Sequence, residues 1–274
     1  MRGVFISVVW VYFAALLIGP IAYLCVQAFG GGLTVFLNEV VRPEAVHGFW
    51  LTAEITLIVL LLNVIFGTVT AMVLARQRFW GQTFLSGLID LPFSVSPVIT
   101  GFMLILLVGP GTILGTWFGT MEMKILYALP AMILVTLFVT FPFVVRELTP
   151  ILLAIGTESE EAARTLGANE WQIFLRVTLP AIRWGMIYGA TLTIARAIGE
   201  FGAVLVVSGN ILQLTQTATL HIYQSYVDFN YVGAYAVAAV LLAVSFLILM
   251  ILELVKTRSS AVTEQSISIP MVQP

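Results

Sequence analysis

The chain has 274 residues, of which 60% are apolar and only 9% are charged, and its mean hydropathy is +1.05. Soluble domains average about 45–50% apolar and about 25% charged residues, so this composition excludes a water-soluble fold and predicts an all-α integral membrane protein. The net charge of −2 provides no positive field for nucleic acid, and the single cysteine, Cys25, excludes an intrachain disulfide.

Six apolar segments are long enough to cross a bilayer as helices. In chain order they cover residues 4–28, 55–75, 89–108, 125–145, 184–207 and 232–255. The first is longer than the roughly 7–15 apolar residues of a signal peptide, so we expect a spanning helix there. The sequence predicts three parts: 1–48, a first span with its outer loop; 49–256, a core of five spans; and 257–274, a polar tail expected to be disordered.

Lysine and arginine are distributed unevenly between the predicted loops. With a cytoplasmic N-terminus, that side carries Arg2, Arg76, Arg78, Arg146, Arg164, Arg176, Arg183, Lys256 and Arg258. The opposite side carries only Arg42 and Lys124, while Arg196 falls within a span. Because basic residues favour cytoplasmic loops, we expect both termini and the segment 158–170 to face the cytoplasm.

The third predicted span begins with the unusual stretch LPFSVSPVITG, residues 91–101. Its two prolines, Pro92 and Pro97, remove backbone donors and predict either a simple kink or a broken helix bordering a cavity. In the second case the hydroxyls of Ser94, Ser96 and Thr100 could meet a polar solute in a translocation pathway.

The charged segment between the fourth and fifth spans predicts two short helices. Thr157 and Glu160 match a capping box, which would begin the first helix. Gly167 fits the left-handed position that ends it, and Asn169 with Gln172 would cap the second. A small apolar stripe on the first helix is formed by Ala162, Ala163 and Leu166. Such a tip could pack on the chain's own spans or receive a partner protein.

Two opposite charges, Arg196 and Glu200, fall in the middle of the fifth predicted span. A charge at mid-bilayer costs about 2.5–3.5 kcal/mol on insertion scales, and the i, i+4 spacing places both on one helix face. We expect either an intrahelical ion pair that faces the bundle or a pair that lines the substrate pathway.

The sequence predicts neither an ATPase site nor a metal site in this chain. Neither Lys124 nor Lys256 lies in a G-x-x-x-x-G-K-[ST] phosphate-binding loop, so no ATPase site is predicted. His47 and His221 map to outer loops without metal-ligand spacing, which predicts surface histidines rather than a metal site. No catalytic residue and no cofactor is expected in this chain.

The stretch EAARTLGANEWQIFLRVTLP, residues 161–180, closely resembles the EAA loop of membrane-spanning subunits of bacterial ABC importers. The resemblance implies the type I importer permease fold and a coupling helix at about 158–170 that docks on an ATP-hydrolysing subunit. The docking residues that it implies are Glu161, Ala162, Ala163, Arg164, Leu166 and Gly167. It further implies a second homologous permease subunit, two copies of the ATPase holding ATP–Mg, a periplasmic binding protein and a bacterial inner-membrane location.

The stretch from Gly199 to Tyr223, which begins GEFGAVLVVSGNI and ends TQTATLHIY, resembles sulfate/thiosulfate permease subunits of the CysW kind. Molybdate and tungstate permeases share its first residues, so they remain the alternative. A secondary transporter driven by an ion gradient would also need charged residues inside its spans, and a non-transporting anchor would not. Of these classes, only the importer explains the EAA loop.

Overall fold

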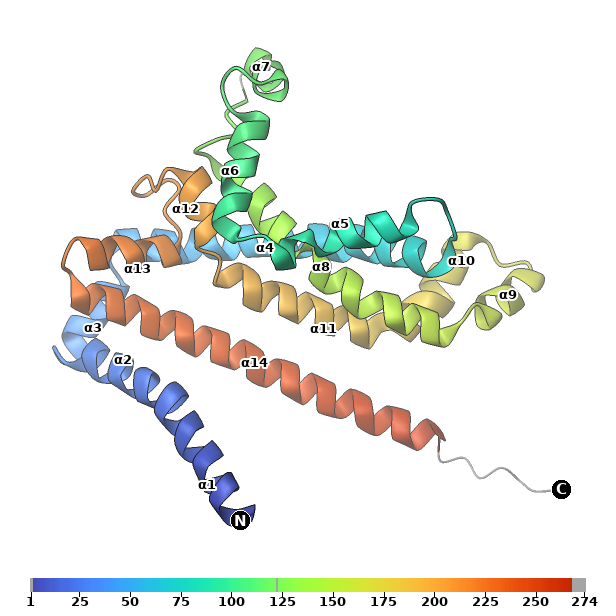
Figure 1. Cartoon of the computed structure of the whole chain (residues 1–274), viewed down its shortest axis with the longest axis horizontal. Helices are drawn as coiled ribbons and strands as arrows, with labels where there is room; N and C mark the ends of the chain where they lie inside the picture. The colour runs from blue at the N-terminus through green and yellow to red at the C-terminus, as the bar shows by residue number, and fades with distance from the viewer. Residues whose placement is uncertain (1, 122, 268–274) are drawn as a thin grey trace. The chain divides into compact units, whose positions relative to one another are not determined.

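The computed structural model describes the backbone of residues 2–121 and 123–267 and the side chains of 5–121 and 123–251. These residues form helices and connecting turns, and no strand occurs among them. The elements (Figure 1) are α1 (Arg2–Phe13), η1 (Ala14–Ile18), α2 (Gly19–Phe29), α3 (Leu33–Val40), α4 (Pro43–Arg76), α5 (Gln82–Ser94), α6 (Pro97–Val108), α7 (Ile113–Thr120), α8 (Leu129–Ile155), α9 (Glu158–Thr165), α10 (Glu170–Ile173), η2 (Phe174–Thr178), α11 (Leu179–Ile198), α12 (Gly202–Ser208), α13 (Ala218–Val227) and α14 (Tyr231–Ile267). The two η elements are π-helical.

The lengths of these helices agree with a protein that crosses a membrane several times. Stretches long and apolar enough to span are Phe5–Phe29, Pro43–Arg76, Leu129–Ile155 and Tyr231–Ile251. Two further helix pairs, each bent at a break, bring the number to six if each pair is one span. The predicted all-α organisation with about six spans is therefore confirmed for the part of the chain that the structure describes.

The third predicted span is a broken helix rather than a kinked one. The axes of α5 and α6 differ by 116°, and the break falls at Val95 and Ser96. Pro97 explains its position, because a residue that precedes proline is driven to extended backbone, and Ser96 has φ −59° and ψ 136°. Pro92, by contrast, lies inside α5 without ending it.

The fifth predicted span is also interrupted. The helical stretch Glu170–Ile198 meets α12 at an angle of 57°, with Gly199 to Phe201 between them. Arg196 and Glu200 therefore lie inside this bent span, but at its interruption rather than on one continuous helix. Arg196 belongs to the last turn of α11, and Glu200 lies in the break itself.

The described chain divides into two compact units, of which the larger contains residues 53–121, 123–209 and 245–267. Within this unit α8 and α11 pack side by side, with α9 and α10 at one end of the pair (Figure 1). Glycines allow the close approach: a Cβ on Gly189 would lie 3.0 Å from the Cα of Val144. A buried apolar core joins α4, α5, α8 and α11: Ala71, Leu74, Ile89, Val144, Val145, Leu148, Leu152 and Ile182.

The smaller unit contains residues 2–52 and 210–244. Here α13 packs against the first turns of α4, where the Thr52 hydroxyl accepts a hydrogen bond from the Ala218 amide at 3.0 Å. His47 and His221 lie in α4 and α13 respectively, so the prediction that both map to loops is wrong. Both side chains are half-buried, and burial lowers the pKa of His221.

The helix α14 continues to Ile267 and so enters the segment that was expected to be disordered from residue 257. Extending an existing helix by one residue is much easier than nucleating a new one, which is consistent with this continuation of α14, and the disorder of the tail stays a prediction. Residues 268–274 of that tail lie outside the described residues.

Candidate functional site

The segment α9 to α10 forms the predicted helix–glycine–helix turn. Gly167 has φ +85°, a left-handed conformation that favours glycine. Its amide donates to the Arg164 carbonyl at 3.0 Å, and the Ala168 amide donates to the Ala163 carbonyl at 3.1 Å. This pair of bonds is a Schellman motif, which ends α9 within one residue. The predicted left-handed glycine is confirmed.

The predicted capping box forms at the start of α10 but not at the start of α9. Asn169 and Gln172 form the expected capping box, with bonds of 2.9 and 3.0 Å. The predicted box at Thr157 is wrong, because its hydroxyl donates to the carboxylate of Glu161 at 2.7 Å and caps no backbone amide. Glu160, the other expected member, is held by a different set of partners.

The carboxylate of Glu160 anchors α9 to the ends of three other elements. It forms an ion pair with Arg76 of α4 at 2.9 Å and accepts a hydrogen bond from Thr178 of η2 at 2.9 Å. Arg76 also donates to the carbonyl of Leu152, near the end of α8, at 2.8 Å. Only 14% of the Arg76 side chain and 16% of the Glu160 side chain are exposed. Sequence reasoning missed this anchor, because Arg76 and Glu160 belong to segments far apart in the chain.

The opposite face of α9 and the following turn are open to solvent. Glu161, Ala162, Arg164, Leu166 and Gly167 are exposed and Ala163 is half-buried. Leu166 is the clearest case, with 88% of its surface exposed. The structure thus brings all six predicted docking residues onto one protruding turn. An exposed leucine beside small residues on a rigid base is suited to contact another protein.

An exposed ion pair spans the Gly167 turn. The guanidinium of Arg164 meets both carboxylate oxygens of Glu170, at 2.9 and 3.1 Å. Because 54% of the Arg164 side chain and 76% of the Glu170 side chain are exposed, water screens the pair and its contribution to stability is small. Arg164 therefore remains available to a partner.

The pair Arg196–Glu200 forms as its spacing predicts, although at the break between α11 and α12. The guanidinium lies 2.7 Å from a carboxylate oxygen. The other oxygen of Glu200 accepts a hydrogen bond from the Ala203 amide at 2.9 Å, which stabilises the start of α12. The Glu200 side chain is only 2% exposed, against 31% for Arg196. This geometry favours the ion pair that faces the bundle, with Arg196 accessible from one side.

The three predicted pathway hydroxyls do not share one surface. Ser94 and Ser96 are exposed at the break between α5 and α6. Thr100 is only 5% exposed, and its hydroxyl donates to the Ser96 carbonyl at 3.4 Å. Thr100 is therefore buried in the described chain, and its contact with a passing solute stays a prediction.

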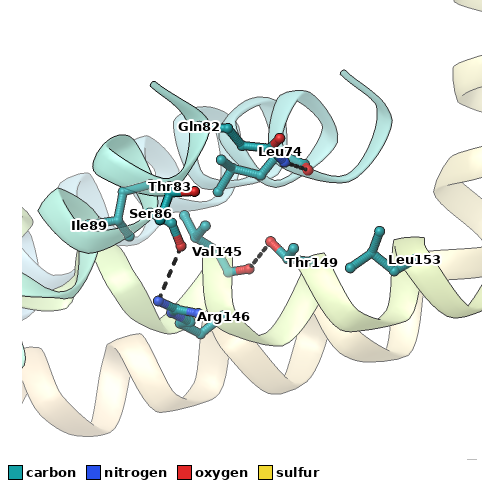
Figure 2. A pocket seen from close by; sticks show the side chains of 9 residues that line it. All are labelled: Leu74, Gln82, Thr83, Ser86, Ile89, Val145, Arg146, Thr149 and Leu153. Carbon is teal, nitrogen blue, oxygen red and sulfur yellow. Dashed lines mark hydrogen bonds between the residues drawn. The ribbon is translucent and has the colours of Figure 1, made fainter. Parts of the chain in front are cut away.

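A polar pocket that the sequence did not indicate lies between α5 and α8 (Figure 2). Its polar lining consists of Gln82, Thr83, Ser86, Arg146 and Thr149, and apolar side chains of α4, α5 and α8 complete it. The cavity measures about 410 Å³. Arg146 was assigned to a cytoplasmic loop, but it belongs to α8 and pairs with Asp90 of α5, Nε to Oδ1 at 2.6 Å and Nη2 to Oδ2.

Comparison with known proteins gives three findings. The family model described as "Binding-protein-dependent transport system inner membrane component" matches residues 63–260. Sulfate transport system permease protein CysW of Escherichia coli strain K12 is 44% identical over 245 residues, 89% of this chain and 84% of the relative. Chloroplastic sulfate permease 2 of Chlamydomonas reinhardtii is 43% identical over 265 residues, 95% of this chain and 71% of the relative.

The fold also has a solved counterpart. A chain of a bacterial ABC transporter involved in the import of alginate matches with a TM-score of 0.76 over 96% of both chains, at 16% sequence identity. At that identity the match shows a shared fold.

Proposed function

Because the chain belongs to the family of binding-protein-dependent transport system inner membrane components, we propose that it is the permease subunit of an ATP-driven importer of sulfate and thiosulfate. The choice of solute rests on the sulfate permeases that resemble it over most of its length. The proposed location is the inner membrane of a bacterium.

One observation carries the coupling part of the proposal, namely the exposed turn of α9 on a rigid base. The Glu160 anchor ties α9 to the ends of α4, α8 and η2. A force applied to Leu166 or Gly167 by a docked ATPase would therefore be transmitted to several spans at once. We propose that Glu161, Ala162, Ala163 and Arg164 complete this contact.

The transport cycle follows from that connection. Two ATPase copies, each docked on the coupling turn of one permease subunit, would move together when they bind ATP. Their approach would turn the cavity between this chain and a second, homologous permease subunit toward the outer side. A periplasmic binding protein would deliver sulfate there, and hydrolysis would return the cavity to the cytoplasm. ATP–Mg would be held by the ATPase, and no cofactor is proposed for this chain.

Within the spans, we propose that Ser94, Ser96 and the accessible side of Arg196 border the pathway. These groups lie at the two helix breaks, where irregular backbone is tolerated in a membrane only if protein or water covers it. Glu200 would act by holding Arg196 and the start of α12 in place.

The proposal is tested by reconstituting the purified complex in liposomes with [35S]sulfate and the binding protein. Uptake should require ATP and should be competed by thiosulfate. Molybdate or tungstate uptake in place of sulfate would move the assignment to the alternative oxyanion. Sulfate uptake by this chain alone, driven by an ion gradient without ATP, would replace the importer with a secondary transporter.

A further inference from the structure

The cavity between α5 and α8 has two charged side chains, Arg146 and Asp90, beside it on the surface of membrane-spanning helices. Arg146 lies about 13 Å along α8 from its end at Ile155, at a rise of about 1.5 Å per residue. The side chains of Arg146 and Asp90 are 47% and 38% exposed in the chain alone. Charges within a membrane-spanning helix rarely face lipid, so we expect this surface to border a water-filled space or another protein subunit.

The pocket contains hydrogen-bond donors that no group in the described part of the chain uses. Within the described part of the chain, Nη1 of Arg146 and the hydroxyl of Thr83 have no hydrogen-bond partner. Ser86 accepts a long bond of 3.4 Å from Nη2 of Arg146, and within the described part of the chain its hydroxyl donates no hydrogen bond. A guanidinium with two neighbouring hydroxyls binds oxyanions well, because Arg presents parallel N–H groups to paired oxygens.

Asp90 opposes such binding. It occupies Nε and Nη2 of the guanidinium, so an incoming anion meets Nη1 first and must then compete with the carboxylate for Nη2. A like charge at contact distance weakens the binding of an anion. The result is a site of low affinity. An oxyanion leaves it easily when Asp90 pairs with the guanidinium of Arg146 again.

We propose that this pocket is an oxyanion subsite of the translocation pathway, in which Arg146, Ser86 and Thr83 bind a tetrahedral oxyanion and Asp90 displaces it. The inference rests on the proposed function for the identity of the anion as sulfate. The cavity of about 410 Å³ is much larger than a tetrahedral oxyanion, so the ion would be bound together with water.

The test measures equilibrium binding of [35S]sulfate to the full-length chain in lipid nanodiscs without ATP. The wild type should bind sulfate weakly and saturably. Asp90→Asn should bind it about tenfold more tightly, because a like charge has been removed. Arg146→Gln should bind none. An ion pair with a purely structural role predicts instead that Asp90→Asn binds no more tightly, and that result would overturn the proposal.

Two further variants guard against misfolding. The double variant Asp90→Asn with Arg146→Gln leaves no unpaired charge, and it should still bind no sulfate. Ser86→Ala with Thr83→Ala leaves the ion pair intact and should weaken binding severalfold, because two donors are lost. Sulfate binding at the wild-type level by either of these double variants would refute the subsite.

Arg42→Gln is the matched control, since Arg42 also forms an ion pair with a carboxylate, Glu39, and its side chain is 52% exposed. It should bind sulfate as the wild type does. ATP-dependent sulfate uptake is measured in parallel to separate the two proposals. If the wild type takes up sulfate and Arg146→Gln binds sulfate as well as the wild type does, the subsite is refuted and the proposed function stands. If the variants bind sulfate as expected but the wild type shows no ATP-dependent uptake, the subsite stands and the proposed function is refuted.

Discussion

At the scale of single residues, the backbone conformation of Gly167 limits which residues can replace it. A Cβ added there would meet no atom within 4 Å in this chain, so space is not the constraint. The constraint is φ +85°, which costs an L-residue about 1–2 kcal/mol and a β-branched residue more.

We therefore predict that Gly167→Val distorts the end of α9 and abolishes ATP-dependent uptake while the protein still inserts in the membrane. The measurement compares uptake in proteoliposomes with the amount of assembled protein. Gly119→Val is the control, because a Cβ there also meets open space and φ is not in the left-handed region. Normal transport by Gly167→Val would count against a coupling role for this turn.

The ion pair of Arg196 and Glu200 gives a second prediction at this scale. Arg196→Met leaves a carboxylate that is 2% exposed without its cation, and breaking a buried pair in this way costs about 3–5 kcal/mol. Glu200→Gln should be milder, because Arg196 can reach water and the amide oxygen can still accept from Ala203.

Thermal unfolding of the detergent-solubilised protein should therefore rank Arg196→Met as the least stable. The double variant Arg196→Met with Glu200→Gln should recover part of the loss, since no charge is left unpaired. Growth on sulfate as the sole sulfur source provides an independent readout. Equal unfolding temperatures for the single and double variants would show that the two side chains do not depend on each other.

At the scale of elements, the position of α9 depends on Glu160. Its carboxylate links α9 to Arg76 and Thr178, and a hydrogen bond to a charged group contributes about 1.5–3 kcal/mol. We predict that Glu160→Ala detaches α9 from its base. Hydrogen exchange of the amides in 158–168 should then accelerate by about tenfold or more, since about 1.4 kcal/mol corresponds to a factor of ten.

Glu158→Ala is the matched control for this prediction. Glu158 lies on the same first turn of α9 but is exposed, so exchange in 158–168 should stay close to the wild-type rate. Unchanged exchange in Glu160→Ala would show that α9 is positioned by packing rather than by the anchor.

At the scale of the whole molecule, the sidedness of the loops remains a prediction from the distribution of lysine and arginine. The side chains of Arg2, Lys256 and Arg258 lie outside the described residues, so this prediction rests on their sequence positions. It places the turn at 158–170 and the loop around Leu212 on opposite sides of the membrane.

Single-cysteine labelling tests this arrangement directly. In a Cys25→Ser background, Glu158→Cys and Leu212→Cys each introduce a thiol at an exposed position. A membrane-impermeant maleimide should label Leu212→Cys in intact cells, and should label Glu158→Cys only after the membrane has been permeabilised. Labelling of Glu158→Cys in intact cells would reverse the predicted orientation and would exclude docking on a cytoplasmic ATPase.

The sequence by itself determined the features that depend on neighbours within a turn or two. Apolar runs of spanning length gave the six spans, and the resemblance of the EAA loop gave the family, which the comparisons confirm. The left-handed Gly167, the capping box of Asn169 and the pairing of Arg196 with Glu200 also followed from spacing alone. Local geometry fixes such contacts before the helices pack.

The tertiary structure alone decided the contacts between distant segments. Glu160 meets Arg76 across 84 positions of sequence, and Arg146 meets Asp90 across 56. Whether Thr100 faces a pathway or the interior depends likewise on the angle at which α6 leaves α5. Spacing along a helix predicts which side chains share a face. What that face contacts depends on how the helices pack, because the ionic partner or the rest of the cavity wall lies on a neighbouring helix.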